Sequence, residues 1–226
     1  AVGNVAVGAN ALDALTTGGN NVAFGNSAGG AITTGIRNVC IGESAGDHSP
    51  ALTTGSYNVV IGAFSEPTTA DAQFANVIGY NVSGAGGYTT IGSASSDIRA
   101  QNGVASWAAV SDQRYKKDIV DSTTGLSFIN ALRPRTFKYK TLGELPETFS
   151  AYEADSTEVF KNSETNHGFI AQEIKAAIDA DASIKDGFRL WDDREDGSQE
   201  VAEAALIPVL VKAIQELTAR LETLEG

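Results

Sequence analysis

The sequence contains little of what proteins use to bind metals or to cross membranes. It has no methionine, one cysteine (Cys40) and two histidines (His48 and His167). One cysteine excludes an intrachain disulfide, and these three side chains are too few for a usual zinc ligand set, so we expect no metal and no cofactor. The sequence has no run of about 18 apolar residues, so we expect no membrane span. The start of the chain does not resemble a signal peptide, and we interpret the missing initiator methionine as the sign of a piece of a longer protein.

Positive charge is scarce as well. The chain has 16 Lys and Arg residues against 28 Asp and Glu residues, which gives a net charge of −12. Its two most basic runs, Arg114–Lys117 and Arg133–Lys140, are both interrupted by other residue types. An acidic chain without a basic cluster argues against nucleic acid and against an anionic membrane surface as partners.

Glycine and charge are distributed unevenly along the chain. Residues 1–110 contain 18 of the 24 glycines and only eight charged residues, whereas residues 111–226 contain six glycines and 36 charged residues. So abrupt a change in composition predicts two domains. We place a glycine-rich stem at residues 1–106 and a second domain at residues 107–226.

The stem repeats one short motif with a period close to 17 residues. The copies are NVAVG (4–8), NVAFG (21–25), NVCIG (38–42), NVVIG (58–62), NVIG (76–79) and TTIG (89–92). A β-rich run closed by glycine and repeated at a short period predicts stacked β-coils. Because each repeat has few apolar residues, we favour several chains wound together as a trimeric β-helix. The alternative is a β-solenoid formed by one chain.

The second domain has the pattern of an α/β (α+β) fold. We expect a helix over Thr123–Leu132, a strand over Thr136–Lys140, and a helix with Ile170, Ile174 and Ile178 on one face. Near the C-terminus a heptad pattern predicts a further helix, with Pro208 in its first turn. Its apolar positions are Ile207, Leu210, Ile214, Leu217, Leu221 and Leu224. This seam is short, so the helix forms either a short coiled coil between chains or a helix that packs on its own domain.

The composition changes at the segment SDQRYKKDI, residues 111–119. A serine hydroxyl needs a base to become a nucleophile, and a neutral lysine can supply one. Ser111 and Lys116 are five residues apart, so in a helix or a strand their side chains point in different directions. The pair therefore requires a bend between the two residues or a neighbouring chain that supplies one of them. Two solvated side chains are the alternative.

Four motifs of the second domain occur in a fixed order: SDQRYKKDI (111–119), LRPRTFKYK (132–140), HGFIAQEI (167–174) and LIPVLVKAIQEL (206–217). Through them the domain resembles the C-terminal intramolecular chaperones of phage tail spikes and tail fibres, the self-cleaving S74 peptidase family. Related domains occur in membrane-bound transcription factors of the myelin regulatory factor type.

This resemblance implies a homotrimer whose C-terminal domains help three stems to wind into a β-helical fibre. The chaperone is then expected to cut itself off between Val110 and Ser111, with Ser111 as the nucleophile and Lys116 as the general base. The resemblance also implies a virion tail fibre or spike that is assembled in the host cytoplasm, and from which the chaperone is released.

Four further residues of the matching motifs have supporting roles in this interpretation. We expect Asp112 and Arg114 to support the loop around the serine, with Arg114 fixing it through carboxylate or backbone contacts. Gln172 and Glu173 are expected to be structural rather than catalytic, because they lie in a predicted helix.

The stem resembles the glycine-rich repeats of phage tail-fibre stems and the heads of trimeric autotransporter adhesins. A host-cell receptor or glycan is therefore a candidate partner of the stem. Its aromatic residues either present a receptor-binding surface or pack between coils or chains; they are Tyr57, Phe64, Phe74, Tyr80 and Tyr88. The alternatives to a self-cleaving chaperone are a permanent trimeric adhesin without cleavage and a Ser-Lys hydrolase that acts on other substrates.

Overall fold

The computed structural model describes residues 1–184 and 188–225, and the chain divides into two compact units, Ala1–Lys117 and Asp118–Gly226. The boundary between the two units, after Lys117, lies C-terminal to the one expected between residues 106 and 107. The reason is that strand β10 (Ala108–Ala109) pairs with strand β9 (Ser96–Gln101) and so keeps this part of the chain with the first unit.

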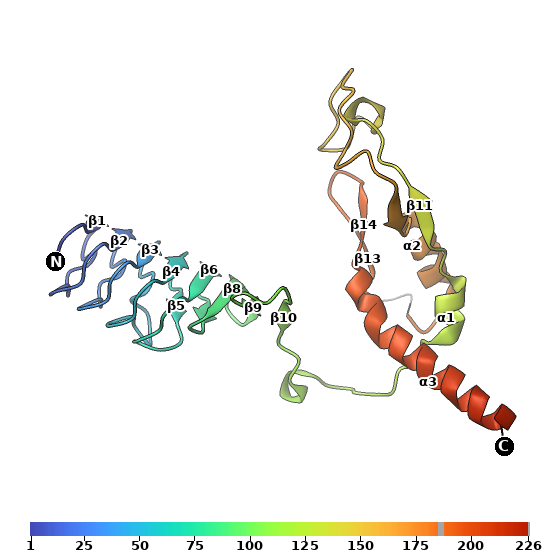
Figure 1. Cartoon of the computed structure of the whole chain (residues 1–226), viewed down its shortest axis with the longest axis horizontal. Coiled ribbons are helices and arrows are strands. Elements are labelled where there is room, and N and C mark those ends of the chain that lie inside the picture. The colour runs from blue at the N-terminus through green and yellow to red at the C-terminus, as the bar shows by residue number, and fades with distance from the viewer. Residues whose placement is uncertain (185–187, 226) are drawn as a thin grey trace. The chain divides into compact units, whose positions relative to one another are not determined.

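The first unit is a β-solenoid of about five turns (Figure 1). Its stacked parallel strands are β1 (Val5–Val7), β2 (Val22–Phe24), β3 (Val39–Ile41), β4 (Val59–Ile61), β6 (Asn76–Tyr80) and β8 (Tyr88–Ser93). Each predicted repeat therefore supplies one strand, which confirms the repeat pattern. A second parallel pair joins β5 (Glu66–Pro67) to β7 (Ser83–Gly84), and antiparallel β9 and β10 follow β8 in the main sheet.

Each coil forms within one chain, although its apolar residues are few. One residue in each of strands β2, β3, β4 and β6 is fully buried, and none of the four is large: Ala23, Cys40, Val60 and Val77. Asparagine fills much of the remaining interior. The side chain of Asn38 donates to Asn21 Oδ1 at 3.1 Å and accepts from Asn58 Nδ2 at 3.0 Å, so the asparagines of successive repeats form a hydrogen-bonded ladder. A narrow interior of small residues and paired amides does not require large apolar side chains.

The glycine that closes each repeat allows neighbouring coils to approach. Gly62 has a φ of +120°, and a Cβ added to it would collide with the carbonyl oxygen of Gly79 in the next coil. Any other residue would therefore be strained and would push the coils apart.

Aromatic side chains of the stem pack between coils. The rings of Tyr57 and Phe74 stack with centroids 5.2 Å apart, and Phe64 meets Tyr80 edge to face at 6.0 Å. These rings contact the adjacent coil, while Tyr57, Phe74 and Tyr80 also remain 40%, 53% and 58% exposed. A receptor-binding role for the aromatic residues stays a prediction.

The second unit combines helices with two antiparallel hairpins. Its elements are α1 (Leu126–Ala131), β11 (Arg135–Phe137), η2 (Leu142–Glu144), β12 (Asn166–Gly168), α2 (Ala171–Ala180), β13 (Trp191–Asp193), β14 (Gln199–Val201), η3 (Glu203–Ala205) and α3 (Leu206–Glu225). β11 pairs with β12, and β13 pairs with β14. The core residues are Phe128, Ile174, Ile178, Leu190, Leu206 and Val209. The predicted helices and the strand are present with shorter bounds, because α1 begins only after Gly125 and Ile170 precedes α2 as its N-cap.

Helix α3 packs on its own unit through a different face from the predicted seam. Leu206, Val209 and Ala213 are buried. All six seam residues remain between 43% and 82% exposed; they are Ile207, Leu210, Ile214, Leu217, Leu221 and Leu224. The helix therefore uses one stripe within the chain and leaves the heptad seam free. Among the residues that the structure describes, no helix has the length and apolar character needed to cross a membrane.

Candidate active site

A single 3-10 turn, η1 (Gln113–Tyr115), lies between Ser111 and Lys116. It supplies the bend that the spacing of these two residues requires within one chain. As a result, Lys116 Nζ donates a hydrogen bond to Ser111 Oγ at 2.7 Å. A serine hydroxyl and an amine in direct contact have the geometry of a nucleophile and its base.

Asp112 and Arg114 hold the turn in this conformation. The Asp112 carboxylate caps the turn by accepting from the Arg114 backbone N–H at 2.8 Å, and it also accepts from Arg114 Nε at 3.0 Å and from the terminal guanidinium at 2.7 Å. The side-chain hydrogen bonds from Arg114, followed by the backbone one, lower the pKa of Asp112. The turn ends where the Lys116 N–H donates to the Gln113 carbonyl oxygen at 2.9 Å. Arg114 thus fixes the loop through a carboxylate.

The pair is solvent-exposed in the single chain. Ser111 and Lys116 are both exposed. Large apolar neighbours are exposed as well, with Val110 at 57%, Tyr115 at 74% and Val120 at 86%. A lysine acts as a base only when its amine is neutral, and removal from water favours that form. The single chain therefore positions the two groups without taking the lysine out of water.

Residues 111–182 match the Peptidase_S74 family model, which is described as chaperone of endosialidase. We call this stretch, which is similar to that family, the S74 region. The match begins at Ser111 and ends before α3, and β-solenoid repeats precede it, so the resemblance inferred from the motifs is confirmed. The S74 family implies self-cleaving activity of the peptidase type. No curated protein and no solved structure matches the chain.

Gln172 and Glu173 of the S74 region lie at the start of α2, in the second unit. Glu173 Oε2 accepts from Arg135 Nε at 2.9 Å, and Glu173 Oε1 lies 3.3 Å from Arg133. The hydrogen bonds from Arg135, with the charges of both arginines, lower the pKa of Glu173. These contacts join Arg133, which precedes β11, and Arg135, the first residue of β11, to the start of α2, as a structural role requires. Gln172 is exposed.

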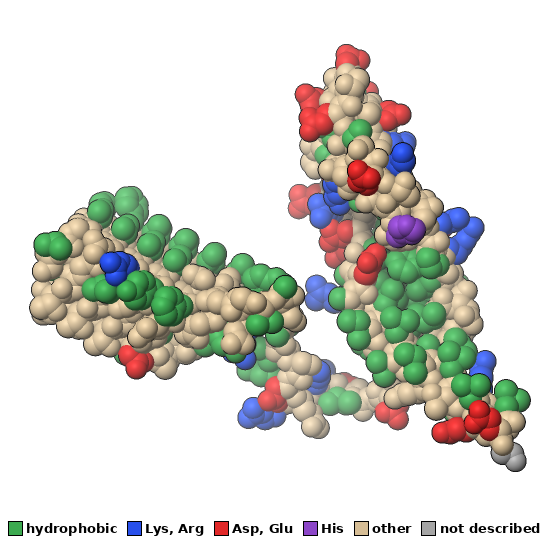
Figure 2. Space-filling model, in the orientation of Figure 1, with side chains coloured by type: hydrophobic (Ala, Val, Ile, Leu, Met, Phe, Trp, Pro, Cys, Tyr) green, Lys and Arg blue, Asp and Glu red, His purple; other side chains and the backbone are tan. Residues whose placement is uncertain are grey.

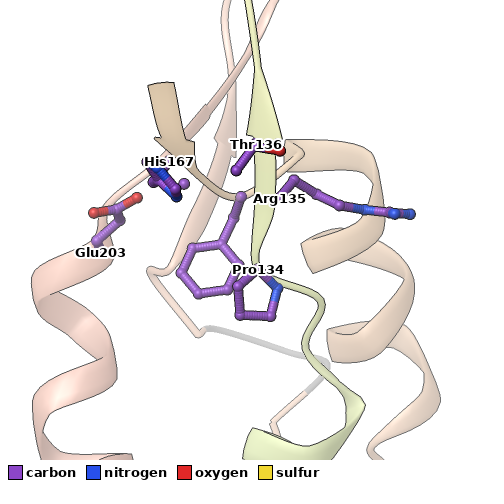
Figure 3. Close-up of a pocket in the computed structure, with 7 residues that line it drawn as sticks. Pro134, Arg135, Thr136, His167 and Glu203 are labelled. Atoms are coloured by element: carbon purple, nitrogen blue, oxygen red, sulfur yellow. The ribbon is translucent and has the colours of Figure 1, made fainter. Parts of the chain in front are cut away.

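The S74 region also contributes to a shallow cavity of about 410 Å³ in the second unit (Figure 3). His167 and Glu203 lie on one side of it and Pro134 lies across from them, while the Arg135 side chain points away toward α2. The cavity contains neither Ser111 nor Lys116. Within residues 1–184 and 188–225, no group of three or more His, Cys, Asp or Glu side chains is arranged to hold a metal ion.

One buried carboxylate in the stem was not anticipated from the sequence. Glu66 is only 3% exposed, accepts from Ser83 Oγ at 2.6 Å, and lies 3.2 Å from His48 Nδ1. It occupies the coil position that Gly46 fills in the preceding repeat. A charged residue where another repeat has glycine was the signal that could have located this cluster.

Proposed function

We propose that residues 111–226 are the intramolecular chaperone of a phage tail fibre or spike. The domain holds three copies together, guides folding of the preceding β-solenoid stem, and is then released by cleavage between Val110 and Ser111. The hydrogen bond from Lys116 to Ser111 carries this proposal, because it lies at the first residue of the S74 match.

The proposed chemistry uses only groups of the chain and one water molecule. Ser111 Oγ attacks the carbonyl carbon of Val110 while the neutral Lys116 amine takes the hydroxyl proton. The C–N bond between Val110 and Ser111 then breaks, and the leaving nitrogen takes the proton back from Lys116. Water hydrolyses the resulting ester, leaving a Val110 carboxylate and the free hydroxyl. The same balance holds when the attacking serine belongs to a neighbouring copy.

Assembly supplies the condition for cleavage in this account. The exposed apolar side chains Val110, Tyr115 and Val120 flank the dyad, so a surface that packs on them also excludes water from Lys116. Loss of hydration favours the neutral amine. Cleavage then follows correct assembly and reports its completion.

Helix α3 is the proposed trimerising element. Its heptad seam is free in the single chain, whereas the stripe that packs on the second unit is already buried. Even in a short coiled coil, apolar a and d residues pack as knobs into holes of the neighbouring helices. Three copies held at one end have a raised effective concentration at the other, which speeds the slow non-local pairing of their stems. Once cleavage has removed the chaperone domain, the stems can no longer unfold by the route along which they folded, so the fibre becomes kinetically stable.

The setting follows from the same proposal. The chain assembles in the host cytoplasm and the stem remains in the virion tail fibre or spike, where a host-cell receptor or glycan is its external partner. Nucleic acid and membrane are not partners in this account, given the net charge of −12.

The assembly step is tested with Ile214→Lys combined with Leu217→Lys. Both residues are exposed in the single chain, so the substitutions remove the seam without removing intrachain packing. We expect light scattering to show a trimer for the parent chain carrying Ser111→Ala and a monomer for the seam variant in the same background. Gln215→Lys, which adds charge to another exposed part of α3, is the matched control and should remain trimeric. A trimer in all three proteins would remove α3 from the proposal, and a monomeric parent would remove trimerisation.

Two other functions make different predictions. A permanent trimeric adhesin assembles in the same way but remains one uncut chain. A Ser-Lys hydrolase acting on other molecules turns over added peptide or ester substrates repeatedly. A chaperone that cuts one bond in itself does not remain one uncut chain, and it does not turn over added substrates repeatedly.

A further inference from the structure

Six positions of the solenoid, spaced one coil apart, share a left-handed backbone conformation, and we call them the left-handed column. The backbone N–H of each member beyond the first donates to the carbonyl oxygen just before the preceding member. Tyr57 N–H, for example, donates at 3.0 Å to the oxygen of Ile36, which precedes Arg37. Each member has a φ between +56° and +76°; they are Gly3, Asn20, Arg37, Tyr57, Phe74 and Gly87.

The arginine, the tyrosine and the phenylalanine of the column are strained by this conformation. Glycine adopts a left-handed φ freely and asparagine does so often, but a bulky side chain rarely does. Tyr57 and Phe74 are 40% and 53% exposed, so they do not fill the interior of the coils. Strained residues that the core does not require are typical of functional surfaces.

The side chains of these three members form one stack. The Tyr57 and Phe74 rings are inclined by only 12°, with centroids 5.2 Å apart. The Arg37 guanidinium lies 5.5 Å from the Tyr57 ring centroid and donates to the Tyr57 hydroxyl at 3.0 Å. Figure 2 shows hydrophobic side chains gathered beside a basic residue on the first unit. Tyr57 thus covers one face of the Phe74 ring and fixes its orientation.

The stack ends at Phe74, because the next member of the column is Gly87 and has no side chain. Within the described residues, a Cβ added to Gly87 would meet no atom within 4 Å, whereas one added to Gly3 would meet the Asn20 side chain. Successive coils are about 4.8 Å apart, as neighbouring strands are, which leaves room for one ring. The outer face of Phe74 therefore borders an open position of that size.

Uncharged polar groups border this position. Gln73 and Asn102 are both exposed. Asn102 Nδ2 donates to Phe74 O at 2.8 Å, and Gln73 O accepts from the Gly87 N–H at 2.9 Å. Residues 72–96 contain no Asp, Glu, Lys or Arg. A ligand that fits here is neutral, has an apolar face the size of one ring, and carries polar groups at its rim.

We propose that the outer face of Phe74 binds a neutral pyranose unit of a glycan. A sugar such as β-glucose has ring faces that carry only C–H bonds, and the negative face of an aromatic ring attracts such hydrogens. The amides of Gln73 and Asn102 offer donors and acceptors to the sugar hydroxyl groups. The inference rests on the proposed function, which gives the stem an external partner, and it names the surface and the class of ligand.

Other ligands satisfy these observations less well. A nucleic acid base also stacks on an aromatic ring, but its phosphates need a basic groove, and residues 1–110 contain two arginines against six acidic residues. An acidic sugar needs a cation, which residues 72–96 do not supply. A protein partner in a stable complex covers about 800 Å² of surface, far more than one ring offers.

The experiment is saturation-transfer difference NMR of the full-length protein, with methyl β-glucoside, methyl β-galactoside and methyl β-N-acetylglucosaminide as probes. Phe74→Asn removes the ring and introduces the residue that Asn20 already provides in the same column, so the backbone tolerates it. Gly87→Asn keeps the ring and places a side chain over its outer face. Asn20→Gly, which changes a distant member of the column, is the matched control. Circular dichroism checks that each protein is folded.

We expect at least one probe to give a signal with the parent protein that is about tenfold weaker with Phe74→Asn and with Gly87→Asn, and unchanged with Asn20→Gly. No signal for any probe with the parent would overturn the site, and so would a signal that either Phe74→Asn or Gly87→Asn leaves unchanged. The intact mass of the same samples reports cleavage separately. A cut parent that binds no probe overturns only the site, whereas an uncut parent that binds at Phe74 supports the site and overturns only the self-cleaving chaperone.

Discussion

Replacing Asn38 by Ala should destabilise the stem more than any change of similar size on its surface. Asn38 is fully buried and its side chain makes four hydrogen bonds. The Nδ2 group donates to Gly55 O at 2.9 Å and to Asn21 Oδ1 at 3.1 Å, and Oδ1 accepts from the backbone N–H and from Nδ2 of Asn58, both at 3.0 Å. An alanine at this position makes none of these bonds.

The magnitude follows from which groups lose their partners. Asn21 Oδ1 still accepts from the backbone N–H of residue 38 at 2.9 Å, and Asn58 Nδ2 still donates to Ala72 O at 2.8 Å. The Asn58 backbone N–H and the Gly55 carbonyl oxygen, by contrast, lose their hydrogen bonds to the Asn38 side chain. A buried polar group left without its partner costs about 1–3 kcal/mol, so Asn38→Ala should lower the free energy of unfolding by about 2–6 kcal/mol.

Native-state hydrogen exchange at the amides of β3 and β4 measures this loss in the stem separately from the second unit. The parent and variant are compared at one protein concentration, because association also changes apparent stability. Thr54→Ala, at an exposed position, is the control and should change stability by about 0.5 kcal/mol or less. A loss below about 1 kcal/mol for Asn38→Ala would refute the view that the asparagine ladder stabilises the coils.

Three further predictions follow from individual contacts. The Cys40 thiol should react with a thiol reagent only in denaturant, because burial and, secondarily, Asp47 raise its pKa to about 12; rapid reaction in the native protein would contradict the packing. Glu173→Gln should lower the free energy of unfolding of the second unit at neutral pH, as measured by urea unfolding. The pKa of Glu173 is lowered in the folded protein, so its carboxylate loses its stabilising contribution as it becomes protonated. The difference in unfolding free energy between parent and variant should therefore shrink below about pH 4. Glu216 caps helix α1 from α3: its carboxylate accepts from the Leu126 N–H at 2.9 Å, because Gly125 at the N-cap has no side chain to do so. Glu216→Ala should therefore lower the stability measured by thermal unfolding by about 1 kcal/mol. The control Glu222→Ala, at an exposed position of the same helix, should not change it.

The periodic features of the stem were predictable from the sequence, and its interior was not. The motif at 38–42 and its copies predicted every parallel strand of the main sheet, because period and closing glycine are local signals. The few apolar residues per repeat favoured winding of several chains, whereas the coil closes within one chain. Asparagine usually lies on surfaces, so the burial of Asn38 in a ladder could be recognised only once the coils were stacked.

The candidate site shows the same division between local and three-dimensional information. The motif around Ser111 identified the residues, but their spacing alone argued against contact with Lys116. The turn η1 resolves this by bending the chain, and Asp112 and Arg114, both named from the motif, hold it. The heptad seam of α3 was readable from spacing, whereas the second stripe that packs on the unit became evident only from burial.

The central claim is self-cleavage before Ser111, and the intact mass of freshly expressed protein tests it most directly. The account predicts two fragments, of 110 and 116 residues, for the parent chain, and a single uncut mass for Ser111→Ala and for Lys116→Ala. Lys117→Ala, which changes the neighbouring lysine, is the matched control and should still be cut. One intact mass for the parent and all three variants would contradict self-cleavage, and cleavage that persists in Lys116→Ala would contradict the lysine as its base.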